Sequence, residues 1–232
     1  MSIRLHRNLL ATLFLCAFTS GASAAPPEQT SPDGLQLTPS KNVEMLYTRT
    51  GASLAGYKQV AMLDCYVAFR KNWQRDQNDA AIRVTAADMD RIKTKLAEEF
   101  RKVFVAELTK AGYAMTDKGG DDVLILRPAI IDLDVTAPDN MSAGMNRTFS
   151  TSAGSMTLFL ELLDGATGQI IARAADRHNA SDMGVMMWQN SVTNRAEADR
   201  QLQKWADLLV KALGNAHAAT GSAPPSAAPA AP

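Results

Sequence analysis

The chain has few of the residues that most catalytic and metal sites need. Its 232 residues include only two cysteines and three histidines, and just one of each, Cys65 and His178, lies in the central part of the sequence. A single cysteine forms neither an internal disulfide nor a thiolate metal site, and a single histidine excludes spacings such as H-E-x-x-H. The G-x-S-x-G elbow and the phosphate-binding loop are also missing. We therefore predict that the protein is not an enzyme and uses no cofactor or metal.

A net charge and a long apolar run are missing as well. The chain has 24 basic and 24 acidic residues, a balance that gives no electrostatic signal for nucleic-acid binding. No apolar run approaches the roughly 20 residues of a membrane-spanning helix. We expect no nucleic-acid partner and no transmembrane segment in the mature chain.

The N-terminus has the pattern of a secretory signal peptide. Residues 1–8 contain two arginines and no acid, the apolar run Leu9–Phe18 follows, and an A-x-A site ends at Ala24. This pattern predicts cleavage after Ala24 and a periplasmic protein, free or associated with the outer membrane. Lipid attachment at Cys16 is the less favoured alternative, because Leu15 is too large for the position before a lipidated cysteine.

Composition divides the rest of the chain into three parts. Residues 25–40 are rich in Pro, Ser, Thr and Gly and predict a linker. Residues 216–232 are almost entirely small residues and proline, a composition typical of a disordered tail. Between them we expect one domain, residues 41–215, which is of ordinary size for a single domain.

Hydrophobic periodicity within the domain predicts an α+β fold. Alternation indicates strands and three- and four-residue spacing indicates helices, in this order: strand 60–69, helix 84–111, strand 122–135, strand 155–163, strand 169–177 and helix 195–213. The β-α-β-β-β-α order favours a two-layer, four-stranded mixed sheet with two helices packed on one face. Thr85 fits a capping box, Gly112 and Gly214 fit helix ends, and Pro128 marks a bulge or an edge.

This topology sends three strand ends to the same end of the sheet. The loops that follow them, 70–83, 136–154 and 178–193, hold an unusual share of tryptophan, methionine and arginine, which are residue types enriched at interfaces. We predict a partner-binding surface there, formed by Arg70, Trp73, Arg75, Met141, Met145, Arg147, Met186, Met187 and Trp188. The alternative is that the two tryptophans fold back and close the end of the core.

Two other sets of residues allow chemistry but favour none. His178 could serve a Ser/His/Asp triad, although a surface histidine at a strand end is the simpler interpretation. Asp132 and Asp134 share a strand face and could act as acid and base or bind calcium. Without further oxygen ligands nearby, solvent-facing carboxylates at a strand end are the favoured interpretation.

Several segments resemble the proteobacterial envelope proteins known as domain of unknown function 3313, many of which are predicted lipoproteins. The resemblance spans nearly the whole domain and lies in 57–77 (YKQVAMLDCYVAFRKNWQRDQ), 87–104, 121–138 (DDVLILRPAIIDLDVTAP), 155–177 and 191–209. It implies an envelope location and no assigned activity. The sequence departs from the lipoprotein members because Cys16 lacks a good lipobox.

Together these observations favour a non-catalytic, exported envelope protein that binds another, unidentified envelope component through the three loops. A periplasmic module that binds a lipid or small molecule between the apolar sheet and the Met-rich loops is the alternative. A hydrolase that uses His178 is the least favoured.

Overall fold

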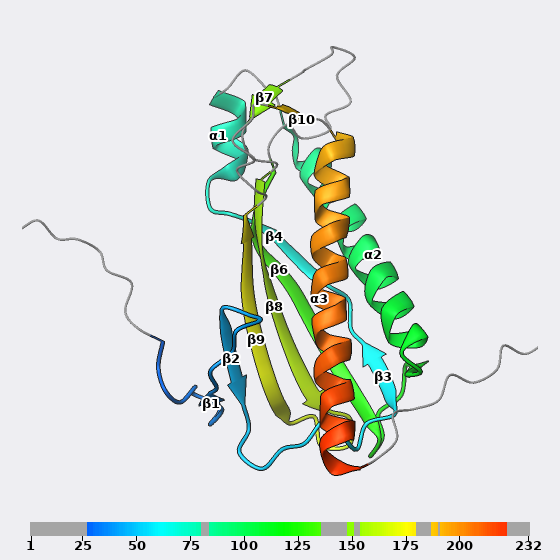
Figure 1. Cartoon of the computed structure of the whole chain (residues 1–232). Coiled ribbons are helices and arrows are strands. Elements are labelled where there is room, and N and C mark those ends of the chain that lie inside the picture. The colour runs from blue at the N-terminus through cyan, green and yellow to red at the C-terminus, as the bar shows by residue number, and fades with distance from the viewer. Residues whose placement is uncertain are drawn as a thin grey trace, which may run out of the picture.

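The computed structural model describes residues 27–79, 84–135, 148–150, 154–179, 187–189 and 191–221. Figure 1 shows a strongly twisted sheet with two long helices lying across one face. The elements, in chain order, are β1 Gln36–Leu37, β2 Met45–Thr48, β3 Gln59–Met62, β4 Tyr66–Phe69, α1 Trp73–Asp79, α2 Ala86–Lys110, β5 Ala114–Thr116, β6 Val123–Val135, β7 Thr148–Ser150, β8 Gly154–Asp164, β9 Ile170–Asn179, β10 Met187–Gln189 and α3 Ser191–Thr220.

The fold is α+β with a mixed sheet, as predicted, but the sheet has eight strands instead of four. Its order is β1-β2-β9-β8-β6-β3-β5, and β4 pairs with β6 beyond the end of β3. β3 and β4 run parallel to β6, whereas β6, β8 and β9 form the predicted antiparallel meander. The additional strands β1, β2 and β5 have only two to four residues each, too few for an alternating pattern to stand out in the sequence.

Pro128 explains why the predicted strand 60–69 is two strands. The backbone N–H of Leu63 donates to Leu126 O, so the backbone groups of Leu126, and of Pro128 two residues later, are directed toward β3 and β4. Proline has no N–H to donate. The neighbouring strand is interrupted at this level, between Met62 and Tyr66. Pro128 therefore interrupts the ladder on this side of β6, at the level between the end of β3 and the start of β4.

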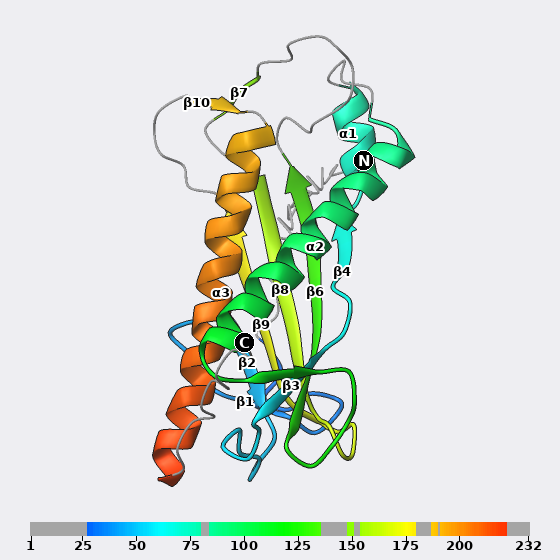
Figure 2. The same cartoon turned by 90° about the vertical axis from the view of Figure 1, so that its right-hand side faces the viewer.

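The core lies between the sheet and the two long helices (Figures 1 and 2). Side chains of one sheet face pack against the apolar stripes of α2 and α3, and their fully buried members include Phe100, Phe104, Leu126, Leu202 and Leu213. The rings of Phe100 and Phe104 stack with centroids 4.0 Å apart. The predicted capping box is present at the start of α2, because Thr85 and Asp88 bond each other's backbone N–H groups, and Gly112 has the predicted left-handed backbone with φ 95°.

Residues on both sides of the predicted domain, 41–215, pack against it. Within 27–40, where we expected a linker, Leu35 is fully buried and β1 pairs with β2. At the other end, α3 continues through Gly214 to Thr220 and buries His217. Gly214 therefore does not end the helix, since the buried positions Leu209, Leu213 and His217 continue the same stripe beyond it.

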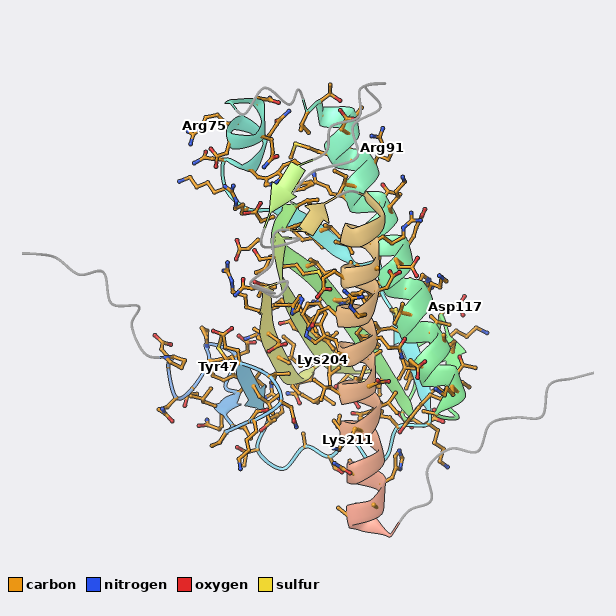
Figure 3. The ribbon with its side chains drawn as sticks, turned by 45° about the horizontal axis from the view of Figure 1, so that its top comes forward. Tyr47, Arg75, Arg91, Asp117, Lys204 and Lys211 are labelled. Carbon is orange, nitrogen blue, oxygen red and sulfur yellow. The ribbon has the colours of Figure 1, made fainter. Side chains whose placement is uncertain are left out.

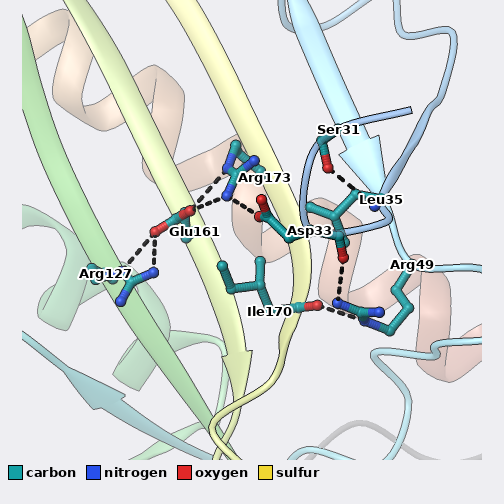
Figure 4. Close-up of polar contacts among 8 residues, drawn as sticks. All are labelled: Ser31, Asp33, Leu35, Arg49, Arg127, Glu161, Ile170 and Arg173. Atoms are coloured by element: carbon teal, nitrogen blue, oxygen red, sulfur yellow. Dashed lines mark hydrogen bonds and ion pairs between the residues drawn. The ribbon is translucent and has the colours of Figure 1, made fainter. Parts of the chain in front are cut away.

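The opposite face of the sheet carries a chain of ion pairs (Figure 4). Glu161 on β8 is buried and bonds Arg127 on β6 and Arg173 on β9. Arg173 also pairs with Asp33, which lies in the N-terminal segment. The pairs fix this segment against the sheet, and a buried carboxylate with two arginine partners satisfies the requirement that buried charges be paired.

Candidate functional site

The ends of three strands meet at the end of the sheet where we predicted the binding surface. β4 and β9 both run parallel to β6, so the chain leaves all three strands at the same end. In Figure 1 this is the upper end, where α1, β7 and β10 also lie. The short strands link the second and third loops, because β7 pairs antiparallel with β10 and places Phe149 opposite Trp188.

Trp73 lies at the start of α1, and its side chain belongs to the core. It is 1% exposed, its ring stacks on Phe69 with centroids 4.1 Å apart, and its indole N–H donates to Val135 O at 3.3 Å. Asn72 begins this turn with a left-handed backbone, φ 64°. Of the two interpretations of Trp73, an exposed contact or a side chain that closes the core, the structure shows the second.

Arg70 connects the ends of β4, β6 and α1. Its guanidinium donates to Asp76 and Asp134, each at 2.6 Å. The hydrogen bonds that Arg70 donates to Asp76 and Asp134 raise the pKa of Arg70, and the bond to Asp76 lowers the pKa of that carboxyl. Asp134 comes just after a bulge in β6 at which Asp132 has φ 52°. Asp134 is thus an ion-pair partner of Arg70, whereas Asp132 is exposed.

Arg75 remains accessible, with 67% of its side chain exposed and one contact to Asp76. Its helix, α1, is held in place by two hydrogen bonds to Val84: Gln74 Nε2 donates to Val84 O at 3.0 Å, and Val84 N donates to Asn78 Oδ1 at 2.7 Å. These two bonds fix the position of the short helix, and Arg75 points from it toward solvent.

A groove of about 480 Å³ lies beside α1. Its lining comes from all four residues of β4, from the turn after β4, and from α1 and α2. The residues are Tyr66, Val67, Ala68 and Phe69 of β4, Arg70 and Asn72 of the turn, Trp73, Gln74 and Arg75 of α1, and Met89 and Lys93 of α2. Tyr66, which our sequence analysis did not single out, is 66% exposed. Its position two residues after Asp64, on the polar side of the alternating pattern, is the signal that could have identified it.

The other predicted site residues are placed only in part. Met141, Met145, Arg147 and Met186 lie outside the described residues. Met187 and Trp188 are residues of the short strand β10. The structure thus brings Arg70, Trp73 and Arg75 together around the groove and gives no geometry for the remaining side chains.

The residues with catalytic potential have structural contacts. His178 Nε2 lies 3.2 Å from Glu197 Oε1, which ties β9 to α3. Burial raises the pKa of the Cys65 thiol to about 12, so that this thiol is protonated at neutral pH. No cluster of three or more His, Cys, Asp or Glu side chains suited to a metal ion is found within the described ranges. Among these same residues, no helix is long and apolar enough to cross a membrane.

The structure is that of an α+β protein with a mixed sheet and a groove beside one sheet edge. The chain belongs to the family described as protein of unknown function (DUF3313), whose model matches residues 30–209. This match confirms the resemblance found in the sequence. A search of the curated proteins gives no match.

Similar solved structures share only a remote likeness. A PelC dodecamer from Paraburkholderia phytofirmans has 12% identity and a TM-score of 0.33, covering 68% of this chain and 95% of that one. A minor lipoprotein from Acinetobacter baumannii has 8% identity and a TM-score of 0.31, with 70% and 95% covered. A neuraminyllactose-binding hemagglutinin homolog from Helicobacter pylori has 10% identity and a TM-score of 0.37, with 73% and 89% covered. At these scores the likeness carries no functional argument.

Proposed function

We propose that the protein is an exported, non-catalytic component of the bacterial envelope that binds another envelope component through the end of the sheet where β4, β6 and β9 terminate. The convergence of these three strand ends carries the proposal. Loops gathered on a rigid scaffold are the usual place for binding residues, and the contacts of Arg70 hold the base of this surface rigid.

Export is supported by the signal-peptide pattern of residues 1–24. The intact mass of the protein from the periplasmic fraction tests it. We expect a chain that begins at Ala25. A chain recovered from the cytoplasm that still begins at Met1 contradicts the export part of the proposal, and a lipidated chain that begins at Cys16 replaces a free periplasmic protein with a membrane-anchored one.

Cross-linking in cells tests the binding surface. A photoreactive amino acid replaces Arg75 in one variant and Lys211 in the matched control; both positions are exposed, and Figure 3 shows them near opposite ends of the molecule. We expect a discrete high-mass adduct from position 75 and none from position 211. Adducts from position 211 alone, or from neither position, contradict the proposal.

A further inference from the structure

The groove runs along an edge of the sheet. Tyr66 and Ala68 lie on one face of β4 and Val67 and Phe69 on the other, yet all four line the groove. A cavity that touches both faces of one strand must follow its edge. β4 has β6 on one side, and no other described strand pairs with it. Figure 2 shows β4 at the margin of the sheet, beside α2.

The backbone of β4 directs hydrogen-bonding groups into this groove. The N–H of Arg70 donates to Leu133 O on β6, so Ala68 and Tyr66, at two-residue steps, also direct their backbone groups toward β6. The N–H and C=O groups of Val67 and Phe69 therefore point to the other side. Among the described residues these groups have no hydrogen-bond partner. They are the two donors and two acceptors that an added strand would use.

The side chains around the groove indicate the charge of the ligand. Among the described lining residues the charged ones are Arg70, Arg75 and Lys93, and none is an aspartate or glutamate. The acids that pair with these cations, Asp76, Asp134 and Asp90, lie outside the lining. Tyr66, Phe69 and Met89 add apolar surface to the lining. Alternate pockets for apolar and charged side chains are what an extended peptide requires for recognition.

We propose that an extended acidic peptide segment of a partner protein binds in this groove and adds a strand to the free edge of β4. The inference rests on the proposed function, since it assigns a partner chemistry to the same end of the sheet. The four residues of β4 span about 13 Å at roughly 3.3 Å per residue, so the paired part of the peptide is about four residues long. The volume of about 480 Å³ lies within the range of ligand-binding cavities.

Selection from a random eight-residue peptide display library, with the mature full chain as bait, tests the charge. We expect selected peptides that alternate acidic residues with apolar ones. The double variant Arg75→Glu, Lys93→Glu should weaken the binding of the synthesised peptides about tenfold or more, an effect expected for two lost charge contacts. The matched control is Lys102→Glu, Lys110→Glu, because these lysines lie on α2 outside the groove and are 75% and 77% exposed; it should leave affinity unchanged.

N-methylation of the selected peptides tests the strand geometry. Only alternate N–H groups of an added strand face β4. Methylation at those positions should abolish binding, and methylation at the intervening positions should preserve it. Affinity that is insensitive to N-methylation would overturn strand addition. Selected peptides rich in basic residues would overturn the acidic ligand, and a self-association of the chain that the peptides compete away would overturn the separate partner protein.

The cross-linking result and the peptide result together distinguish a failure of the added strand from a failure of the proposed function. Cross-linking at position 75 in cells together with a failed peptide test overturns the added strand alone. Alternating sensitivity to N-methylation without any cross-linked adduct supports the groove chemistry and overturns its use for an envelope partner.

Discussion

Replacing Trp73 with alanine should destabilise the domain by about 4 kcal/mol. The side chain is 1% exposed and stacks on Phe69, and truncation of buried Phe or Trp costs roughly 3–5 kcal/mol through lost transfer energy and the cavity left behind. A domain of this kind has about 5–15 kcal/mol of total stability, so the variant should be marginal. Trp73→Phe keeps a ring against Phe69 and loses the hydrogen bond to Val135 O, which should cost about 1 kcal/mol.

Urea unfolding followed by far-ultraviolet circular dichroism measures these values without depending on tryptophan fluorescence. The matched control is Tyr66→Ala, which removes an aromatic side chain that is 66% exposed and should change stability by no more than about 0.5 kcal/mol. A loss below about 1 kcal/mol in Trp73→Ala, with an unchanged denaturant slope, would refute the assignment of Trp73 to the core. For the same reason partner binding is better tested at Arg75, since a Trp73 variant confuses folding with recognition.

Three further outcomes follow from the structure. Glu161→Gln removes the carboxylate that Arg127 and Arg173 share, while Arg173 keeps Asp33, and should lower the free energy of unfolding by about 2 kcal/mol, against less than about 1 kcal/mol for Glu99→Gln, whose partner Lys102 is 75% exposed. Gly154→Ala should prevent soluble expression of the folded domain, because a Cβ would lie 2.0 Å from Asp134 O. Burial and the Asp164 hydrogen bond raise the pKa of Tyr57 to about 12, so that stability present below about pH 10 is lost as pH rises toward 12; Tyr57→Phe should remove this loss in alkaline unfolding curves.

The long elements were predictable because each carries a pattern of adequate length. α2, β6, β8 and β9 lie where periodicity placed them. The split of strand 60–69 was not predictable from its own residues, since its alternation is continuous. Its cause is Pro128, which lies some sixty residues away in sequence and next to it only in the folded sheet.

Tertiary packing also overrode two local signals. A glycine inside a helix destabilises it by about 1 kcal/mol relative to alanine. The helix α3 nevertheless continues beyond Gly214, because Leu213 and His217 are buried against the core. Within 27–40, the composition suggested a linker, but Leu35 and the Asp33–Arg173 ion pair attach this segment to the sheet. At the candidate site the topology read from the sequence predicted that the ends of β4, β6 and β9 lie together, as they do. It missed the groove, because an unpaired strand edge depends on which strands become neighbours.

The pairing of β2 with β9 sets the order in which the chain can fold. Met45 lies opposite Ala175, so one of the first strands to leave a ribosome or a translocation channel finds its partner only near the end of the chain. The β8–β9 hairpin is local and can form quickly, whereas the N-terminal strands must close long loops. Until then the edge of β2 that pairs with β9 and the edge of β3 that pairs with β6 remain unpaired and prone to aggregation.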